Sequence, residues 1–351
     1  MIFGKKAHLI GLDIGSRAIK LGEVAQKKGH RILKKFGMAK LPQGAIVEGR
    51  IKEPRVVADA IKGLVKQLKV REKNVATSIA GYSVIIKKIV VRKMYDEEFQ
   101  DSVQYEAEQY FPFDLEDVNI DFHIIGEHEA NPNQMNVMLV AAKKEVVDDH
   151  IELLRMADLN PCVIDVDVFA LERAFEDCYL QEEKSVALID IGANRLNVNI
   201  VKNNVSAFTR DVAIGGEEIT REIASRFNCP FEEAEHIKLG KATDRVDQKD
   251  LQDIFFSFIS NWSNEIRRVI DFYYSTYPDE EIKRIILSGG AVQTDGFIRH
   301  LQADTSIEAE MFEPFSYLKI NEKDHDMAYL RRIAPQAAIC MGLAARRVDD
   351  K

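Results

Sequence analysis

The chain has 351 residues, and its 57 acidic residues exceed its 48 lysines and arginines to give a formal net charge of −9. This length exceeds the roughly 250–300 residues that one hydrophobic core usually serves, so we expect two domains. The acidic balance provides no dominant basic face, which argues against a nucleic-acid-binding protein. The four cysteines are scattered without a Cys-x-x-Cys pair, which indicates structural thiols in a reducing compartment rather than disulfides or a metal cluster.

The N-terminal region does not have the pattern of a targeting segment. Its apolar run is short and includes Asp13, unlike the core of a signal peptide. No apolar run in the sequence is long enough to cross a bilayer. We therefore expect a cytoplasmic protein that does not insert directly into a membrane.

The first 80 residues have the order of a ribonuclease-H-like domain, with three strands, a helix and a fourth strand. Apolar residues at helical spacing after Pro54 indicate the helix, because proline favours the first helical turn. Apolar runs between glycine- and proline-containing loops indicate the strands. The expected strands are residues 8–14, the run that ends at Val24, residues 31–39 and residues 75–80, and the expected helix is residues 55–68.

Residues 84–129 have a separate pattern that we interpret as a small inserted subdomain. We expect strands at residues 84–91 and 118–125 within it. A polar loop at residues 131–133 and a strand at residues 135–141 follow this block. A helix begins at Asp96, where acidic residues suit its positive end, and reaches about residue 110. Phe111-Pro112-Phe113 ends this helix, and we hypothesise that these residues line a peptide groove.

The rest of the chain continues to alternate strands and helices. A long helix over residues 250–277 has an apolar face that we assign to a buried core, formed by Ile254, Phe258, Trp262, Ile266, Val269 and Phe272. The other expected strands are residues 161–166, the run that ends at Asp190, and residues 196–201, 206–212 and 284–287. The other expected helices are residues 144–156, 169–179, a helix from Gly215-Gly216 to Phe227, residues 231–239, a helix from Gly296, and residues 335–347.

Two strand ends have the same short motif, in which an aspartate precedes isoleucine, glycine and small residues. They are Asp13-Ile14-Gly15-Ser16 and Asp190-Ile191-Gly192-Ala193-Asn194. Glycine lets the backbone approach a ligand, successive N–H groups can wrap an anion, and an aspartate beside a phosphate can hold a hard cation through water. Either motif alone also fits an ordinary hairpin. Their repetition about half a chain apart predicts a duplicated domain whose hairpins clasp a nucleoside triphosphate and its metal.

Two further glycine pairs follow predicted strands and fit the same nucleotide. Gly215-Gly216 precedes a helix N-terminus, where partial positive charge favours phosphate. Ser288-Gly289-Gly290 would let the backbone pass close under the nucleoside. Glu235 and Lys238 lie three residues apart on one helical face and could hydrogen-bond ribose and base, but alone a surface ion pair explains them better.

The order of these motifs resembles that of the actin/Hsp70 ATPase superfamily over essentially the whole chain. The resemblance implies an actin-like α/β fold, with two duplicated ribonuclease-H-like domains around a nucleotide cleft. The two aspartate motifs correspond to the phosphate motifs, and Ser288-Gly289-Gly290-Ala291 corresponds to the adenosine motif. The segment from Gly215 to Thr220 and the small-residue helix of residues 335–347 correspond to the segments that connect the domains.

Within the superfamily the chain resembles the PilM family of type IV pilus assembly, and then the cell-division family FtsA. The likeness rests on Leu12 to Lys20, residues 105–113 and 140–145, and Ala234-Glu235 with Lys238. The absence of an amphipathic membrane helix at the chain's end favours PilM over FtsA. The resemblance implies ATP and Mg²⁺ as cofactors, and an FtsA-style inserted subdomain.

The resemblance also implies a partner, the N-terminal cytoplasmic tail of PilN, an inner-membrane protein. The tail would lie in a groove between the inserted subdomain and the first core domain. Through PilN the protein would meet the PilN/PilO complex and lie peripheral to the inner membrane. A contact with a pilus motor ATPase and homo-oligomerisation stay open.

The resemblance further implies which residues hold the nucleotide. Asp13 and Asp190 would hold Mg²⁺ through water, and Lys20 either reaches the phosphates or is a solvated strand end. The loops would meet the phosphates through Gly15, Ser16 and Arg17 on one side and through Gly192, Ala193 and Asn194 on the other. The other expected nucleotide contacts are Gly215, Gly216, Glu217, Glu235, Lys238, Gly289, Gly290 and Val292.

Hydrolysis needs a residue that orients water, and Asp167 is the candidate for this catalytic role. Asp165 is as near, and either acid could simply cap the next helix. We expect ATP binding with slow or negligible turnover. An FtsA-like protein, a sugar or acetate kinase of the same fold and a nucleotide-dependent filament former are the alternatives.

The expected domain organisation places the inserted subdomain inside the first core domain. That core domain consists of residues 1–83 and 130–168, on either side of the subdomain of residues 84–129. The second core domain covers residues 169–334. A C-terminal helix within residues 335–351 returns to the first domain.

Overall fold

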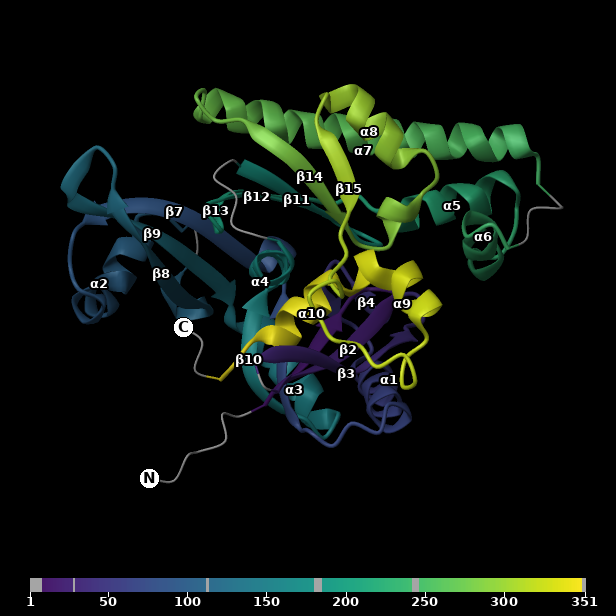
Figure 1. Cartoon of the computed structure of the whole chain (residues 1–351), viewed down its shortest axis with the longest axis horizontal. Helices are drawn as coiled ribbons and strands as arrows, with labels where there is room; N and C mark the ends of the chain where they lie inside the picture. The colour runs from purple at the N-terminus through teal and green to yellow at the C-terminus, as the bar shows by residue number, and fades with distance from the viewer. Residues whose placement is uncertain (1–7, 28, 112–113, 180–184, 242–245, 349–351) are drawn as a thin grey trace.

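A computed structural model describes residues 8–27, 29–111, 114–179, 185–241 and 246–348 of the chain. Two five-stranded sheets form its upper and lower parts, and a three-stranded sheet lies to one side (Figure 1). The first sheet contains β1 (Ile10–Ile14), β2 (Ala18–Lys27), β3 (His30–Lys40), β6 (Asn74–Ile79) and β10 (Asn160–Val166). The second sheet contains β11 (Ser185–Ile191), β12 (Leu196–Lys202), β13 (Val205–Val212), β14 (Ile282–Ser288) and β15 (Glu308–Met311).

The two five-stranded sheets have the same topology. Their strand orders are β10-β6-β1-β2-β3 and β13-β12-β11-β14-β15. In each sheet three consecutive strands form an antiparallel meander, and two later strands join in parallel beside the first of them. The expected duplication of a ribonuclease-H-like α/β unit is therefore confirmed.

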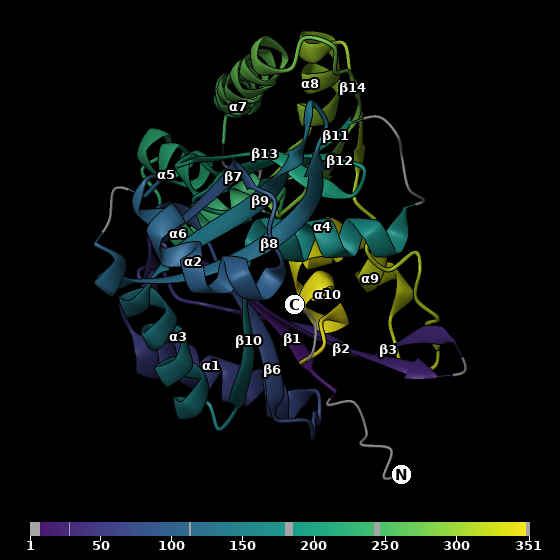
Figure 2. The ribbon, with the colours of Figure 1, turned by 90° about the vertical axis from the view of Figure 1, so that its left-hand side faces the viewer.

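Helices cover the two sheets and also fill the space between them. They are α1 (Pro54–Gln67), α3 (Lys144–Met156), α4 (Asp167–Cys178), α5 (Gly216–Arg226), α6 (Phe231–Lys238), α7 (Gln248–Thr276), α8 (Phe297–Thr305), α9 (Met327–Ile333) and α10 (Ala338–Ala345). Residues of α1 and α3 pack on the first sheet, and residues of α5 to α8 pack on the second. Helices α4 and α10 lie between the sheets in both views (Figures 1 and 2), and one buried cluster joins them to strands of both sheets.

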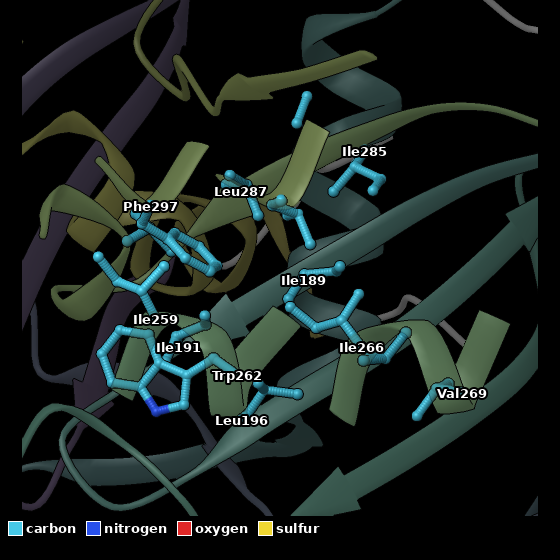
Figure 3. Packing of buried hydrophobic residues seen from close by; sticks show 14 of the residues in the cluster. Ile189, Ile191, Leu196, Ile259, Trp262, Ile266, Val269, Ile285, Leu287 and Phe297 are labelled. Atoms are coloured by element: carbon cyan, nitrogen blue, oxygen red, sulfur yellow. The ribbon is translucent and has the colours of Figure 1, made fainter. Parts of the chain in front are cut away.

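The core of the second half is built on α7, whose buried residues point toward the sheet (Figure 3). Trp262 is fully buried, and its ring meets that of Phe297 edge to face with centroids 5.6 Å apart. Ile266 packs in the same cluster, beside Ile189 of the central strand β11. The predicted burial of Trp262, Ile266 and Val269 is confirmed.

One residue of the predicted apolar face of α7 does not belong to the core, and another lies at its edge. Phe272 exposes 57% of its surface, and Tyr273 is buried in its place. Likewise Phe258 is only partly buried, and Ile259 points into the core. Successive residues of an α-helix are about 100° apart around its axis. A residue predicted one position too early therefore lies at the edge of the core or outside it.

The inserted subdomain consists of a three-stranded sheet and one helix. It contains β7 (Val84–Arg92), β8 (Val118–His128), β9 (Asn131–Lys143) and α2 (Asp96–Glu108). The sheet order is β7-β9-β8, so β9 is the middle strand and pairs with both neighbours. We expected the subdomain to end at residue 129, but this pairing continues the same sheet to Lys143. The β8–β9 turn lies at residues 129–130, and the expected polar loop at 131–133 belongs to β9.

Phe111 belongs to the core of the inserted subdomain and does not line a groove. Its side chain is 5% exposed and packs in a cluster with Phe99, Val103 and Leu139. The hypothesis that Phe111 lines a peptide groove is therefore wrong, because its ring, just after α2, covers the sheet of the inserted subdomain. Pro112 and Phe113 lie outside the described residues.

Several short elements were not expected, and the final helix is shorter than predicted. The additional elements are β4 (Ile46–Val47), β5 (Arg50–Ile51), η1 (Gly81–Ser83), η2 (Leu115–Asp117), η3 (Ala291–Gln293), β15 and α9. The C-terminal segment begins as the 3₁₀ turn η4 (Ala334–Ala337) and becomes α-helical only in α10. Within the part of the chain that the structure describes, we find no helix both long and apolar enough to span a membrane.

The corrected face of α7 can be tested by two substitutions. We expect Ile266→Ala to lower the free energy of unfolding by about 2–5 kcal/mol, because it leaves a cavity in the core. Phe272→Ala should cost less than about 1.5 kcal/mol, because the ring is largely in solvent and loses little buried area. Urea denaturation followed by the fluorescence of Trp262, the only tryptophan, measures both values. Equal losses would contradict the corrected face.

Candidate functional site

The two aspartate motifs form matching hairpin loops at the ends of the central strands. The Gly15 N–H donates to the Ala18 carbonyl (3.1 Å), and the Gly192 N–H donates to the Arg195 carbonyl (2.8 Å). Asp13 and Asp190 are the next-to-last residues of β1 and β11. The predicted equivalence of the two motifs therefore extends to their backbone hydrogen bonds.

A glycine pair after β14 packs directly under the second hairpin. Gly289 has φ +92°, and a Cβ atom there would collide with the Ile191 carbonyl, so only glycine fits without strain. Its N–H donates to the Pro335 carbonyl (2.9 Å), which ties this turn to the segment before α10. Gly290 faces the side chain of Gln336.

Val292, which we predicted to contact the nucleotide, lies in the hydrophobic core instead. It lies in the 3₁₀ turn η3, is fully buried and belongs to the hydrophobic core of the second half. Its side chain therefore has no surface to offer a nucleotide. The prediction failed because the Ser288-Gly289-Gly290 motif determines the backbone of the turn, whereas the apolar side chain of Val292 packs into the core.

Two of the aspartates have defined side-chain partners. Lys20 faces Asp13 across the hairpin, and its Nζ donates to Asp13 Oδ2 (2.8 Å). The Ser288 hydroxyl donates to Asp190 Oδ1 (2.8 Å). The Lys20 side chain is 17% exposed, so it is not a solvated strand end. Burial lowers the pKa of Lys20, but the charges of Asp13 and Asp190 outweigh it and raise that pKa.

Asp167 is the third acid of this cluster. Burial, and then the charge of Asp13, raise its pKa to about 7, against the opposing effects of the Ser78 hydroxyl and the Arg195 guanidinium. Burial also raises the pKa of Asp190 to about 6, opposed by its hydrogen bond from Ser288. The negative charges of Asp13 and Asp190 thus raise the pKa of Asp167, and the charge of Asp13 raises the pKa of Asp190.

The structure separates Asp167 from the other catalytic candidate. Asp165 accepts a hydrogen bond from Arg346 Nε (2.6 Å), so its carboxylate is engaged with the chain after α10. The N-cap of α4 is Val166, and Asp167 is already the first helical residue. Capping of α4 by Asp167 is therefore excluded, and its burial beside the hairpins needs another explanation.

A small cavity lies among these charged groups. It measures about 30 Å³ and its polar lining is formed by Asp167, Asp190, Arg195, Asn197 and Asp211. This volume suffices for one or two water molecules. Within the described residues no three His, Cys, Asp or Glu side chains are grouped to hold a metal ion by themselves. The donor set fits a cation held through water and by phosphate, as Mg²⁺ usually is.

The N-terminus of α5 is bonded to the second hairpin. The Gly216 N–H donates to the Gly192 carbonyl (3.0 Å), and the Glu217 N–H donates to the Ala193 carbonyl (2.8 Å). A Cβ atom at Gly215 would collide with the Ala193 carbonyl, so the glycine permits this contact. The two amides that we expected to meet a ligand therefore support the hairpin instead.

Glu217 is also engaged within the protein. Its side chain is 6% exposed and accepts from Arg221 (2.8 Å). The Asn194 side-chain amide donates to Glu217 Oε2 (2.9 Å) and to the Ala193 carbonyl (3.0 Å) when its nitrogen faces these acceptors. The predicted contact of Glu217 with the ribose or α-phosphate of a nucleotide does not agree with this arrangement, because both of its carboxylate oxygens already have donors.

Glu235 and Lys238 form a network that holds α6 against α5. Lys238 Nζ lies 2.7 Å from Glu235 Oε2 and donates to Thr220 Oγ1 (2.8 Å) and the Gly216 carbonyl (3.1 Å). The Thr220 hydroxyl donates to Glu235 Oε2 (2.7 Å). Their side chains are 24% and 17% exposed, so the surface ion pair is excluded. Sequence reasoning missed Thr220, which lies one turn along the helix from Gly216.

Each hairpin sends one arginine into the opposite half of the molecule. Arg17 of the first hairpin lies over the Phe231 ring of α6 (4.8 Å to the centroid) and 3.6 Å from Glu232. Arg195 of the second hairpin packs against the backbone of Gly49 and Gly81 in the first half. Arg195 was not singled out from the sequence, although it directly follows the predicted phosphate loop.

The chain matches the family described as type IV pilus assembly protein PilM over residues 11–348. Among solved structures, a chain of the PilM-PilN type IV pilus biogenesis complex has a TM-score of 0.87 and 28% identity, with 98% of this chain and 100% of that chain covered. MreB 5 of Spiroplasma citri bound to AMPPNP has a TM-score of 0.50 and 9% identity, with 95% and 94% covered. These matches confirm the actin-like fold.

The cell division protein FtsA of Staphylococcus epidermidis is a more distant relative. It is 21% identical over 283 residues, which are 71% of this chain. The chain spans 58% of the length of that FtsA.

The raised pKa of Asp167 predicts a specific dependence of stability on pH. Because the folded protein binds this proton more tightly than the unfolded chain, Asp167 stabilises the fold at acidic pH, and that contribution is lost as the pH rises from about 4 through about 7. We therefore expect Asp167→Asn to stabilise the protein by roughly 1–3 kcal/mol at pH 8. Urea denaturation at pH 5 and pH 8 measures the effect, and a gain that is larger at pH 5 would contradict it.

Proposed function

Because the chain belongs to the PilM family of type IV pilus assembly proteins, we propose that it is a cytoplasmic, ATP-binding component of that assembly machinery. The observation that carries the nucleotide proposal is the pair of matching hairpins beside three neighbouring acids, two of which have raised pKa values. In this proposal ATP lies between the two halves, with its phosphates between Gly15 and Gly192. The likeness in fold to MreB 5, solved with AMPPNP, supports this position.

The loop tips are the phosphate donors in this proposal. The N–H groups of Gly15 and Gly192 are used within their own loops, so the next amides along each tip remain for the ligand. On the first hairpin these are Ser16 and Arg17, and on the second they are Ala193 and Asn194. Mg²⁺ supplies positive charge between the phosphates and carboxylates when bound. Asp13 and Asp190 would hold its water ligands, and the hydrogen bond from Lys20 positions Asp13 for this role.

The base and ribose lie toward α5 and α6 in this arrangement. Glu235 and Lys238 are fixed by Thr220, so they present one orientation to a ribose hydroxyl. The turn at Gly289 and Gly290 lies under the nucleoside because its glycines leave no side chain in the way. Gly215, Gly216 and Glu217 act indirectly, by supporting the second hairpin.

Turnover is slow or negligible in this proposal. Asp167 has a pKa of about 7, so it holds its own proton in about half of the molecules at neutral pH. A protonated acid orients water as a donor and does not accept its proton.

We place the partner peptide at the joint between the inserted subdomain and the first core sheet. The PilM-PilN complex supports PilN as the partner, and its N-terminal cytoplasmic tail is the proposed ligand. At this joint Ile79, Ala142 and Val146 form a buried cluster, and Tyr82 beside them exposes 73% of its surface. PilN in turn holds the protein at the inner membrane beside PilO. A motor ATPase and a second copy of the chain are further candidate partners.

The nucleotide proposal predicts that both aspartates are required. We expect Asp13→Ala and Asp190→Ala each to weaken Mg·ATP binding about tenfold or more, because each removes a ligand to the hydrated cation. Isothermal titration with Mg·ATP measures the affinity. The matched control is Asp253→Ala on the exposed face of α7, which should bind as the unaltered chain does. Unchanged affinity in both cleft variants would overturn the nucleotide site.

The partner proposal predicts a hot spot at the joint. We expect Tyr82→Ala to weaken binding of a synthetic PilN tail peptide about tenfold or more, because an exposed aromatic anchor is lost from the interface. Tyr95→Ala, which removes an equally exposed ring at the start of α2, is the control and should change little. Fluorescence anisotropy of the labelled peptide measures both affinities. A loss in Tyr95→Ala alone would move the binding surface to α2.

A further inference from the structure

The side chain of Arg195 links the second hairpin to the base of the inserted subdomain. A Cβ atom at Gly81 would lie 2.6 Å from one terminal nitrogen of Arg195 and 2.7 Å from the other. A Cβ atom at Gly49 would also collide with the guanidinium. Both glycines have φ +79°, a backbone conformation that favours glycine, at the two positions that contact the guanidinium. The arginine thus occupies a notch that only glycine leaves open.

The notch lies at the joint between two parts of the first half. Gly81 starts η1, the turn that leads from β6 of the first core sheet into β7 of the inserted sheet. Gly49 lies in the turn between β4 and β5. Next to the notch, Ile79 and Val84 pack with Ala142 in the cluster that joins the inserted subdomain to the core. A movement of the guanidinium therefore acts directly on this joint.

The other end of Arg195 belongs to the proposed phosphate site. Its carbonyl closes the second hairpin by accepting from Gly192 N–H. Its side chain lines the cavity that Asp167 and Asp190 also line. A guanidinium prefers a bidentate phosphate contact to packing on backbone, because phosphate offers charge and matched acceptors. A triphosphate at this hairpin would thus compete with the notch for the same side chain.

We propose that Arg195 transmits the nucleotide state to the inserted subdomain. Without nucleotide the guanidinium fills the Gly49–Gly81 notch and holds the joint. With nucleotide it turns to the phosphates, leaves the notch and loosens η1 and β7. This inference rests on the proposed nucleotide site and names the residue that couples it to the partner surface. In this proposal the Arg195 side chain has two alternative positions, in the notch and at the phosphates. The nucleotide site and the joint of the inserted subdomain each shift the equilibrium between these positions.

Hydrogen exchange of residues 81–92 in the full chain tests this link. We expect Arg195→Gln to raise the exchange of this segment about threefold or more in the free protein, because the notch is vacated. Saturating Mg·AMPPNP should raise exchange by a similar factor in the unaltered chain and change Arg195→Gln little further. The control, Arg210→Gln at the exposed position of β13, should respond as the unaltered chain does. Isothermal titration calorimetry of each variant with Mg·AMPPNP gives the nucleotide concentration that saturates it.

The outcomes separate this inference from the proposed function. If the unaltered chain does not bind Mg·AMPPNP, the nucleotide proposal fails, while the comparison of the free proteins still decides whether Arg195 holds the joint. If the unaltered chain binds but residues 81–92 exchange as before, the transmission is refuted. A response of Arg195→Gln equal to that of the unaltered chain also refutes it. Loss of the response in Arg195→Gln, with nucleotide still bound, establishes the link.

Discussion

The close contact between α4 and α10 is the constraint on which the arrangement of the two halves depends. Gly342 of α10 lies against the Ala170 carbonyl of α4, and a Cβ atom at position 342 would collide with it. Gly11 of the first sheet meets the backbone of α10 in the same way. Both helices share one hydrophobic cluster with strands of the two sheets. Closure of a site between the halves must therefore occur by movement about this helix pair.

The charged cluster beside the hairpins is held in place at an electrostatic cost. Asp13 and Asp190 are close enough to Asp167 for their charges to raise its pKa, and the positive charge of Lys20 lowers the pKa of Asp190. Such a cluster is most stable when protons or a cation neutralise it. The packing of α4 and the hydrogen bond from Ser288 keep the acids together nevertheless. Neighbouring acids with raised pKa values are typical of functional sites.

Sequence patterns predicted the duplicated sheets and the two hairpins, because each motif combines strand periodicity with a glycine that the turn requires. They failed where tertiary contacts decide. Phe272 and Tyr273 are both apolar enough for a core, and only packing on the sheet selects Tyr273. Val292 follows a correctly predicted turn, but its side chain belongs to the core. Arg195 could not be found from the sequence because its partners, Gly49 and Gly81, lie more than a hundred residues away.

The duplication has a consequence for the inserted subdomain. β6 and β14 are equivalent strands, since each lies in parallel beside the central strand of its sheet. In the second half β14 runs into the short glycine turn before α8, whereas in the first half the whole three-stranded subdomain occupies the same position before α3. The inserted subdomain of the first half therefore stands where the second half has only a short turn. A partner that binds the inserted subdomain therefore acts on the first half at a position where the second half has only a loop.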